Sequence, residues 1–137
     1  SWYSSNDGLN GEFTARQNLQ IMAGLVGQQA DLSPALEKDI LGLSSFLDIE
    51  TDLLSTGQRQ RLALSCLHFN LGADALWLLD EPNSGLDADG RAAFEALLAA
   101  HQADGGYVLM ASHIALADSL PHTTFEMGSS DSSGRGV

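Results

Sequence analysis

Two short apolar runs that end in polar residues constrain the fold of this chain most strongly. The runs are ALWLLDE (75–81) and YVLMASH (107–113), and an amphipathic segment (87–104) separates them. A continuous apolar run of this length is typical of a strand that is buried on both faces of a parallel sheet. A strand, a helix and a second strand at this spacing predict a βαβ unit with a right-handed crossover and parallel strands.

The residues before this unit carry the patterns of helices. Thr14 and Gln17 form a capping-box pattern at the start of a helical run that ends at Gly27. A serine followed by a proline starts a second helix, which we expect over 33–43. We expect a third helix over 55–71, because its apolar residues recur at helical spacing and a glycine follows.

These patterns divide the chain into three parts. We expect a helical part over 1–74 and a sheet-bearing part over 75–128, which gives an α/β fold class. The sheet-bearing part should also hold a short helix at 114–119 and a weaker strand at 123–128. The tail (129–137) is of low complexity, and we expect it to be disordered.

Composition narrows the classes of function. The 137 residues carry a formal net charge of −12 with six Lys and Arg residues, which argues against nucleic-acid binding through a broad basic face. The single cysteine, Cys66, excludes an intrachain disulfide, and its apolar surroundings predict a buried, unreactive thiol. No run approaches the roughly 20 apolar residues of a membrane span and no signal peptide is visible, so we expect a soluble intracellular protein.

Polar side chains end both predicted strands: Asp80 and Glu81 end the first, and Ser112 and His113 end the second. Ligands of open parallel sheets bind outside the carboxyl ends of the strands, so neighbouring strands would bring Glu81 and His113 to one ligand. An aspartate there suits Mg²⁺ held through water, a following glutamate can polarise an attacking water, and a histidine can hydrogen-bond a phosphoryl group. Each residue alone is also compatible with a helix cap, a solvated turn or a structural role.

Small polar residues begin the third predicted helix, in the stretch LSTGQRQR (54–61). The N-terminus of a helix attracts phosphate through unpaired backbone N–H groups and a partial positive charge. Ser55 adds a hydroxyl donor and Gly57 permits close approach of the backbone. An ordinary N-cap is the alternative, and for Arg59 and Arg61 we favour solvation or pairing with acidic residues.

Four motifs in this chain resemble those of the ATP-binding cassette (ABC) ATPases. LSTGQRQR resembles their signature motif, and ALWLLDEP (75–82) resembles their Walker B strand with its catalytic glutamate. SGLD (84–87) resembles the D-loop and SH (112–113) resembles the H-loop. Order and spacing also agree, so the implied fold is part of the P-loop NTPase fold: a helical subdomain followed by a βαβ portion of the sheet.

Within the ABC ATPases the chain is most similar to the haem-exporter ATP-binding subunits of cytochrome c maturation. The similar stretches are GLNGEFTARQNL (8–19), LSTGQRQRLALSCL (54–67) and the segment 86–113. Thr56 stands in place of the first glycine of the signature, and a small residue at that position fits this group.

The resemblance implies ATP and Mg²⁺ as cofactors and a role for each matched residue. Asp80 would order the Mg²⁺ shell, Glu81 would be the general base for attack of water on the γ-phosphate, and His113 would contact that phosphate. Asp87 would communicate across a dimer. In ABC ATPases two subunits hold two nucleotides between them, head to tail, so the signature residues would clamp the partner's ATP: Ser55, Thr56, Gly57 and Gln58.

The chain departs from the family pattern in two ways. The Q-loop glutamine, which in the family contacts Mg²⁺ and the attacking water, would fall near Asn6, whose side chain is one methylene shorter. No G-x-x-x-x-G-K-[ST] phosphate loop and no adenine-stacking loop occur in these 137 residues. In the family both loops precede the Q-loop, so we expect this chain to be the C-terminal part of a longer protein and inactive on its own.

These features predict a portion of an ABC transporter ATP-binding protein that couples ATP binding and hydrolysis to export, most closely haem export for cytochrome c biogenesis. The expected partners are a second ATPase subunit and transmembrane transporter subunits, which would place the protein in the cytoplasm at the inner face of the cell membrane. One alternative is a non-catalytic ABC-like half-domain that supplies only a signature motif. The other, a DNA-repair-type ABC ATPase, is disfavoured by the acidic charge and by the lack of a coiled-coil insertion.

The missing phosphate loop gives the first prediction. The 137-residue chain alone should not bind Mg-ATP measurably, because no loop amides and lysine are present to hold the β- and γ-phosphates. Titration of the chain with a fluorescent ATP analogue measures this directly, and micromolar binding would contradict the expectation.

Overall fold

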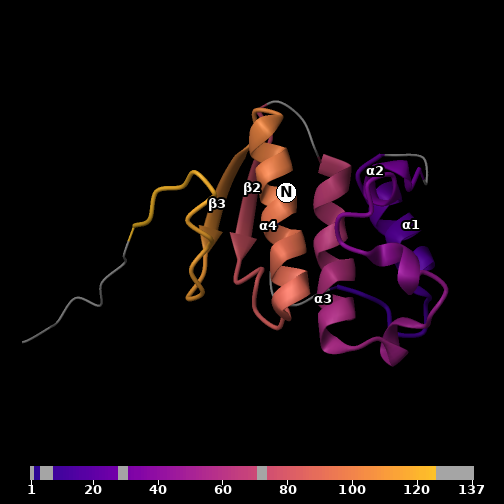
Figure 1. Cartoon of the computed structure of the whole chain (residues 1–137). Helices are drawn as coiled ribbons and strands as arrows, with labels where there is room; N and C mark the ends of the chain where they lie inside the picture. Colours follow the sequence, from indigo (N-terminus) through magenta and orange to yellow (C-terminus); the bar gives the residue numbers. More distant parts are fainter. Residues whose placement is uncertain (1, 4–7, 28–30, 71–73, 126–137) are drawn as a thin grey trace, which may run out of the picture.

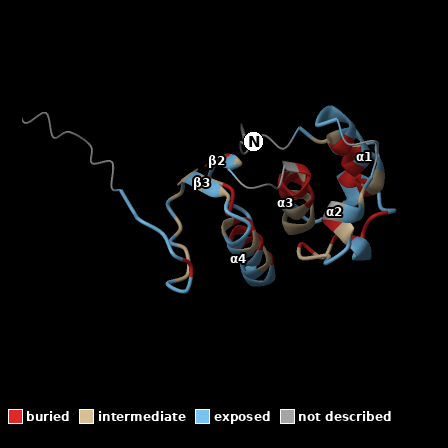
Figure 2. Ribbon diagram, turned by 90° about the horizontal axis from the view of Figure 1, so that it is seen from above, coloured by how far each residue is buried: buried red, intermediate tan, exposed pale blue. Residues whose placement is uncertain are grey.

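The structure is a computed structural model that describes residues 2–3, 8–27, 31–70 and 74–125. The helices α1 and α2 lie at one side and α3 lies next to them (Figure 1), whereas α4 lies beside α3 and against one face of the sheet (Figure 2). In chain order the elements are β1 (Trp2–Tyr3), α1 (Ala15–Leu25), α2 (Ser33–Leu36), η1 (Leu43–Ser45), η2 (Thr51–Leu53), α3 (Thr56–Leu64), η3 (Ser65–Asn70), β2 (Leu76–Asp80), α4 (Ala88–Ala103) and β3 (Tyr107–Ala111).

The predicted strand, helix and strand form in the expected order, and their two strands are parallel neighbours. β2 and β3 pair along their whole length, from Leu76 opposite Tyr107 to Asp80 opposite Ala111. β1, which the sequence analysis did not predict, pairs in parallel with the other edge of β2 and completes a sheet of order β1-β2-β3. A strand of two residues is too short to produce a recognisable period in the sequence.

The sheet departs from the prediction in its burial. Trp77 and Leu79 are buried, whereas Leu76 and Leu78 on the opposite face of β2 are 49% and 38% exposed. Leu109 of β3 is 64% exposed. The prediction of strands buried on both faces is therefore wrong for the described residues, because α4 covers one face of the sheet (Figure 2) and no described helix covers the other.

A stacked pair of rings ties α4 to the sheet. The His101 ring lies parallel to the Trp77 ring, with centroids 3.7 Å apart and an interplanar angle of 4°. Nε2 of His101 lies 3.1 Å from the Ala75 carbonyl oxygen and 3.3 Å from that of Tyr107. Because Ala75 immediately precedes β2 and Tyr107 begins β3, one fully buried side chain sets the helix against the starts of both strands.

In the helical region, the starts of the helices agree with the prediction more closely than their ends do. Thr14 caps α1 with both hydrogen bonds of the predicted capping box. The second helix was expected over 33–43, but α2 ends at Leu36. The reason lies at Asp39, which has a positive φ of 41° and whose carboxylate accepts hydrogen bonds from the backbone N–H groups of Leu43 and Ser44. This local bonding replaces the continued helix.

Three further boundaries differ from the prediction. The third helix ends as α3 at Leu64 and continues as the 3₁₀ helix η3, where the buried Ser65 hydroxyl bonds back to the Leu62 carbonyl. No helix forms at 114–119, which holds bends and turns, and no strand forms over 123–125. Residues 126–128 of the weaker predicted strand and the tail 129–137 lie outside the described residues.

A buried amide organises the loop before α1. Asn18 is 4% exposed and accepts a hydrogen bond from the Asn10 backbone N–H at 2.9 Å. Its Nδ2 donates to Thr51 Oγ1 at 2.9 Å, and Thr51 in turn donates to the Phe13 carbonyl at 2.8 Å. Asn18 therefore joins the loop at 10–13 to η2, well away in sequence from the strand ends.

No helix in the described part of the chain is long and apolar enough to cross a membrane. Within the same residues, no group of three or more His, Cys, Asp and Glu side chains is arranged to hold a metal ion.

The packing of α4 gives a stability prediction. Phe94 is 1% exposed in the core, so Phe94→Ala should lower the free energy of unfolding by about 3–5 kcal/mol through lost burial and the cavity left behind. Phe125→Ala is the matched control, because Phe125 is 84% exposed and its truncation should change stability by less than about 0.5 kcal/mol. Urea denaturation of both variants measures the difference, and equal losses would contradict this description of the core.

Candidate functional site

The carboxyl ends of β2 and β3 bring the two predicted catalytic residues into contact. The register places Asp80 opposite Ala111, and the backbone N–H of Glu81 continues the ladder by donating to the Ala111 carbonyl at 2.8 Å. Beyond this point Oε2 of Glu81 lies 2.7 Å from Nδ1 of His113. The strand ends therefore hold a carboxylate and an imidazole as a hydrogen-bonded pair.

This pair is accessible to a ligand. The Glu81 side chain is 34% exposed and the His113 side chain is 71% exposed. Solvent screens an ion pair at such a position, so it contributes little to stability. Since Nδ1 of His113 faces Glu81, Nε2 is the ring nitrogen that remains for a ligand.

Glu81 has a strained backbone. Its φ is +47°, in the left-handed region that costs a non-glycine residue about 1–2 kcal/mol. Such conformations persist where the surrounding structure fixes them, and they cluster at functional sites. Here the N–H of Glu81 is held by Ala111, and its carbonyl accepts the N–H of Ser84 at 3.1 Å.

Asp80, the predicted Mg²⁺ ligand, ends β2 with an exposed side chain. An exposed carboxylate of this kind fits Mg²⁺, which binds proteins through one or two carboxylates and completes its shell with waters and substrate phosphates. Asn6, the other candidate ligand for Mg²⁺ and nucleotide, lies outside the described residues.

The N-terminus of α3 has the predicted cap. Ser55 Oγ accepts a hydrogen bond from the Gln58 N–H at 3.2 Å, and Gln58 Oε1 accepts one from the Ser55 N–H at 2.9 Å. Ser55 and Thr56 are exposed, and Gly57 is half-buried. The cap uses acceptor positions of Ser55 and Gln58, so the hydroxyl hydrogen of Ser55 and the amide nitrogen of Gln58 keep their capacity to donate.

The loop after β2 lies against this helix start. A methyl group added to Gly57 would lie 3.8 Å from the Asp87 carboxylate, and one added to Gly85 would lie 3.6 Å from the Thr56 side chain. Asp87, predicted to communicate across a dimer, caps α4 through a hydrogen bond from the Gly90 N–H to its Oδ1 at 2.8 Å. The structure thus brings the signature and D-loop residues together within one chain.

Two polar residues at this junction, Gln60 and Asn83, were not predicted from the sequence to contribute to the site. Gln60 of α3 donates from Nε2 to the Pro82 carbonyl at 3.1 Å, directly after Glu81. Asn83 is 3% exposed, and its Oδ1 accepts a hydrogen bond from Ser112 Oγ at 2.8 Å. No pattern in the sequence signals these contacts, because each joins segments more than 20 residues apart.

Arg59 has the acidic partner that was expected, whereas Arg61 instead donates to the Leu41 carbonyl at 3.3 Å and lies over an aromatic ring. Arg59 pairs with Asp52 at 3.3 Å, and the Arg61 guanidinium lies 5.7 Å from the centroid of the Phe46 ring. Burial raises the pKa of the Cys66 thiol to about 11, so this cysteine stays protonated and unreactive at neutral pH.

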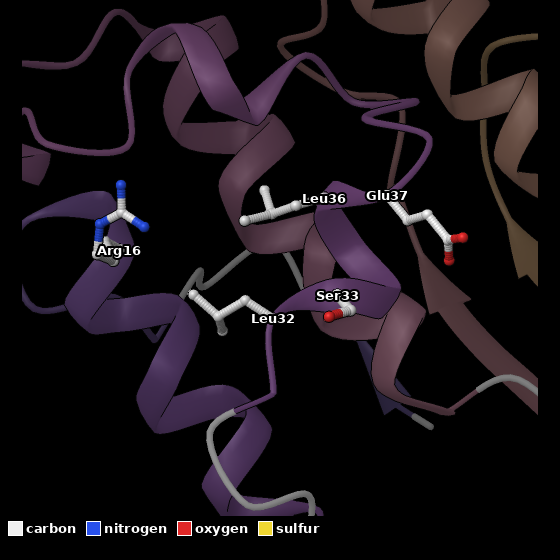
Figure 3. Close-up of a pocket in the computed structure, with 5 residues that line it drawn as sticks. All are labelled: Arg16, Leu32, Ser33, Leu36 and Glu37. Carbon is white, nitrogen blue, oxygen red and sulfur yellow. The ribbon is translucent and has the colours of Figure 1, made fainter.

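A separate cavity lies in the helical region, between α1 and α2 (Figure 3). Its volume is about 650 Å³, and it is lined by Arg16, Leu32, Ser33, Leu36 and Glu37. Arg16 is also paired with Asp48, with Nε 2.9 Å from Oδ1. None of the predicted nucleotide-site residues lines this cavity.

Comparison with known proteins finds relatives among the ATP-binding proteins of ABC transporters. No family model matches the chain. It is 39% identical over 110 residues to the cytochrome c biogenesis ATP-binding export protein CcmA of Xanthomonas oryzae, covering 80% of this chain and 50% of that protein. It is 40% identical over 116 residues to CcmA of Nitrosococcus oceani, covering 85% and 52%. It is 36% identical over 115 residues to ABC transporter I family member 1 of Arabidopsis thaliana, covering 83% and 48%.

The chain thus spans about half the length of the curated relatives that it matches.

Solved structures of ABC transporter ATP-binding proteins have the same fold. The ATP-binding subunit of an ABC transporter matches with a TM-score of 0.66 at 22% identity, over 82% of this chain and 48% of that one. A dimeric bacterial ABC transporter cassette matches with a TM-score of 0.62 at 23% identity, over 82% and 51%. Sequence and fold together show that the chain belongs to the ABC ATPases and is similar to CcmA-type ATP-binding proteins.

Proposed function

We propose that this chain forms part of an ABC transporter ATP-binding protein that couples ATP binding and hydrolysis to export across a membrane. The observation that carries the proposal is the contact between Glu81 and His113, 2.7 Å apart at the ends of two neighbouring parallel strands. A carboxylate held against an imidazole at an exposed strand end is suited to activating a water and hydrogen-bonding a phosphoryl group.

Each residue at the strand ends would have its own role. Asp80 would hold Mg²⁺ through water. Bound ATP would supply the phosphoryl group, and Mg²⁺ would neutralise its charge. Glu81 would orient and deprotonate the attacking water. His113 would receive its orientation from Glu81 through Nδ1 and would donate from Nε2 to the γ-phosphate.

The start of α3 would serve a partner's nucleotide. Its backbone N–H groups, the Ser55 hydroxyl and the Gln58 amide can donate to phosphate without breaking the capping box. Gly57 lies close to the Asp87 carboxylate at the start of α4, so a second ATPase subunit docked head to tail would meet both. One of the similar solved structures is described as dimeric, which supports a paired arrangement.

The export substrate we propose is haem, with a role in cytochrome c biogenesis. The support is the similarity to CcmA proteins, which are named as cytochrome c biogenesis ATP-binding export proteins. The transmembrane subunits of the exporter would be further partners, and the chain would act in the cytoplasm at the inner face of the cell membrane.

The test uses a chimera that joins this chain to the half of the Xanthomonas oryzae CcmA that the match leaves out. The chimera should hydrolyse Mg-ATP. Glu81→Gln in the chimera should lower kcat about 10²-fold or more while ATP affinity stays unchanged, because the amide cannot accept the proton of the water. A phosphate-release assay gives kcat, and equilibrium binding of a labelled nucleotide gives the affinity.

Glu50→Gln is the matched control, since Glu50 is exposed, lies in the helical region and has no predicted role in the site. It should leave both quantities unchanged. Undiminished hydrolysis by the Glu81→Gln chimera would remove Glu81 as the general base.

The second candidate is a non-catalytic half-domain that supplies only its signature motif to a partner. It is favoured by one observation: α3 begins with a complete capping box, so the signature stretch could serve a partner's nucleotide by itself. Hydrolysis by the chimera that depends on Glu81 would decide for the first candidate, and a chimera that binds ATP without turnover would decide for the second.

A further inference from the structure

Asn83 is a buried polar side chain to which the proposed reaction assigns no role. It is 3% exposed, in the loop that carries Glu81 away from β2. A buried side-chain amide is costly unless both of its ends are hydrogen-bonded. Both ends of Asn83 bond to the segment after β3: Oδ1 accepts from Ser112 Oγ at 2.8 Å, and Nδ2 lies 3.4 Å from the Ile114 carbonyl oxygen, to which it donates.

The segment that Asn83 holds has His113 at its centre. The Ile114 N–H donates to Ser112 Oγ at 3.0 Å, so the Ser112 hydroxyl closes a small loop around His113 while it donates to Asn83. The His113 N–H points to Glu81 Oε2 at 3.5 Å, on the same carboxylate oxygen that meets its ring. The residues on both sides of His113 are therefore fixed to Asn83.

Glu81, the partner of His113 in this contact, has a strained backbone. Glu81, two residues before Asn83, has a φ of +47°, and such a conformation persists only when its surroundings fix it. The side chain of Asn83 ties this loop to 112–114 at a point that the backbone pairing of β2 with β3, which ends with the Glu81 N–H, no longer reaches.

We propose that Asn83, acting through Ser112, is a positioning residue that holds the His113 ring against Glu81. Its role is to fix where the histidine stands. Its significance for ATP hydrolysis rests on the proposed function, whereas the positioning itself is a property of the chain alone.

The experiment uses the ¹⁵N-labelled 137-residue chain in NMR. Two quantities are measured: the exchange rates of the His113 and Ile114 amides, and the ¹⁵N shift of His113 Nδ1. Glu81→Gln provides the reference shift for a His113 ring without its carboxylate partner. Asn83→Ala should speed exchange of both amides about tenfold, as expected for one lost net hydrogen bond, and should move the Nδ1 shift toward the reference.

Ser112→Ala breaks the same contact from the other side and serves if Asn83→Ala fails to fold. It should reproduce both changes, and Ser112→Thr, which keeps the hydroxyl, should restore the wild-type values. Asn18→Ala is the matched control, because Asn18 is a buried, hydrogen-bonded asparagine in the helical region. It should destabilise the chain without moving either His113 quantity.

The proposal would be overturned if both Asn83→Ala and Ser112→Ala kept the wild-type amide exchange rates and the wild-type Nδ1 shift. It would also be overturned if Asn18→Ala changed these quantities as much as Asn83→Ala does. The measurement needs no nucleotide and no turnover. A chimera that fails to hydrolyse ATP would thus refute the proposed function and leave the positioning result standing, while unchanged NMR quantities would refute the positioning of His113 alone.

Discussion

The parallel pairing of β2 with β3 is the constraint on which the site depends. The two strands pair residue by residue up to Asp80 opposite Ala111, so the segments that follow them leave the sheet at the same level. Glu81 and His113 then stand 2.7 Å apart, although 32 positions separate them in the sequence. The stack of His101 on Trp77 holds α4 against the starts of the same strands, so the crossover helix supports the register that the site requires.

The second part of the site depends on the docking of α3 against the loop after β2. Gln60 bonds to the Pro82 carbonyl, and Gly57 lies close to the Asp87 carboxylate. The capped helix start, suited to a partner's phosphate, is thereby joined to the loop that carries Glu81. The bond from Gln60 to Pro82 thus joins α3 directly to the loop that follows Glu81.

The sequence carried enough information for the elements that a period or a cap determines. The apolar runs predicted β2 and β3 as parallel strands, and the capping box at Thr14 and the cap residues at Ser55 located the starts of α1 and α3. The end of α2 could not be predicted, because the carboxylate of Asp39 accepts a hydrogen bond from the backbone N–H of Leu43, four residues ahead. The sequence also did not reveal the exposed face of the sheet at Leu78 and Leu109, since a run of apolar residues reads the same whether or not a second layer covers it.

Within the site, motif order pointed to the residues at the strand ends and at the start of α3, whereas the contacts between them required the fold. The bond between Asn83 and Ser112 is a tertiary contact of two ordinary loop residues, and no local rule predicts it. The central claim is that the pairing of β2 with β3 makes Glu81 and His113 one functional unit. A double-mutant cycle on kcat in the CcmA chimera, with Glu81→Gln, His113→Ala and both together, tests it most directly. If the two residues act as one unit, the double variant should be about as slow as the slower single variant, and losses that simply multiply would contradict this coupling.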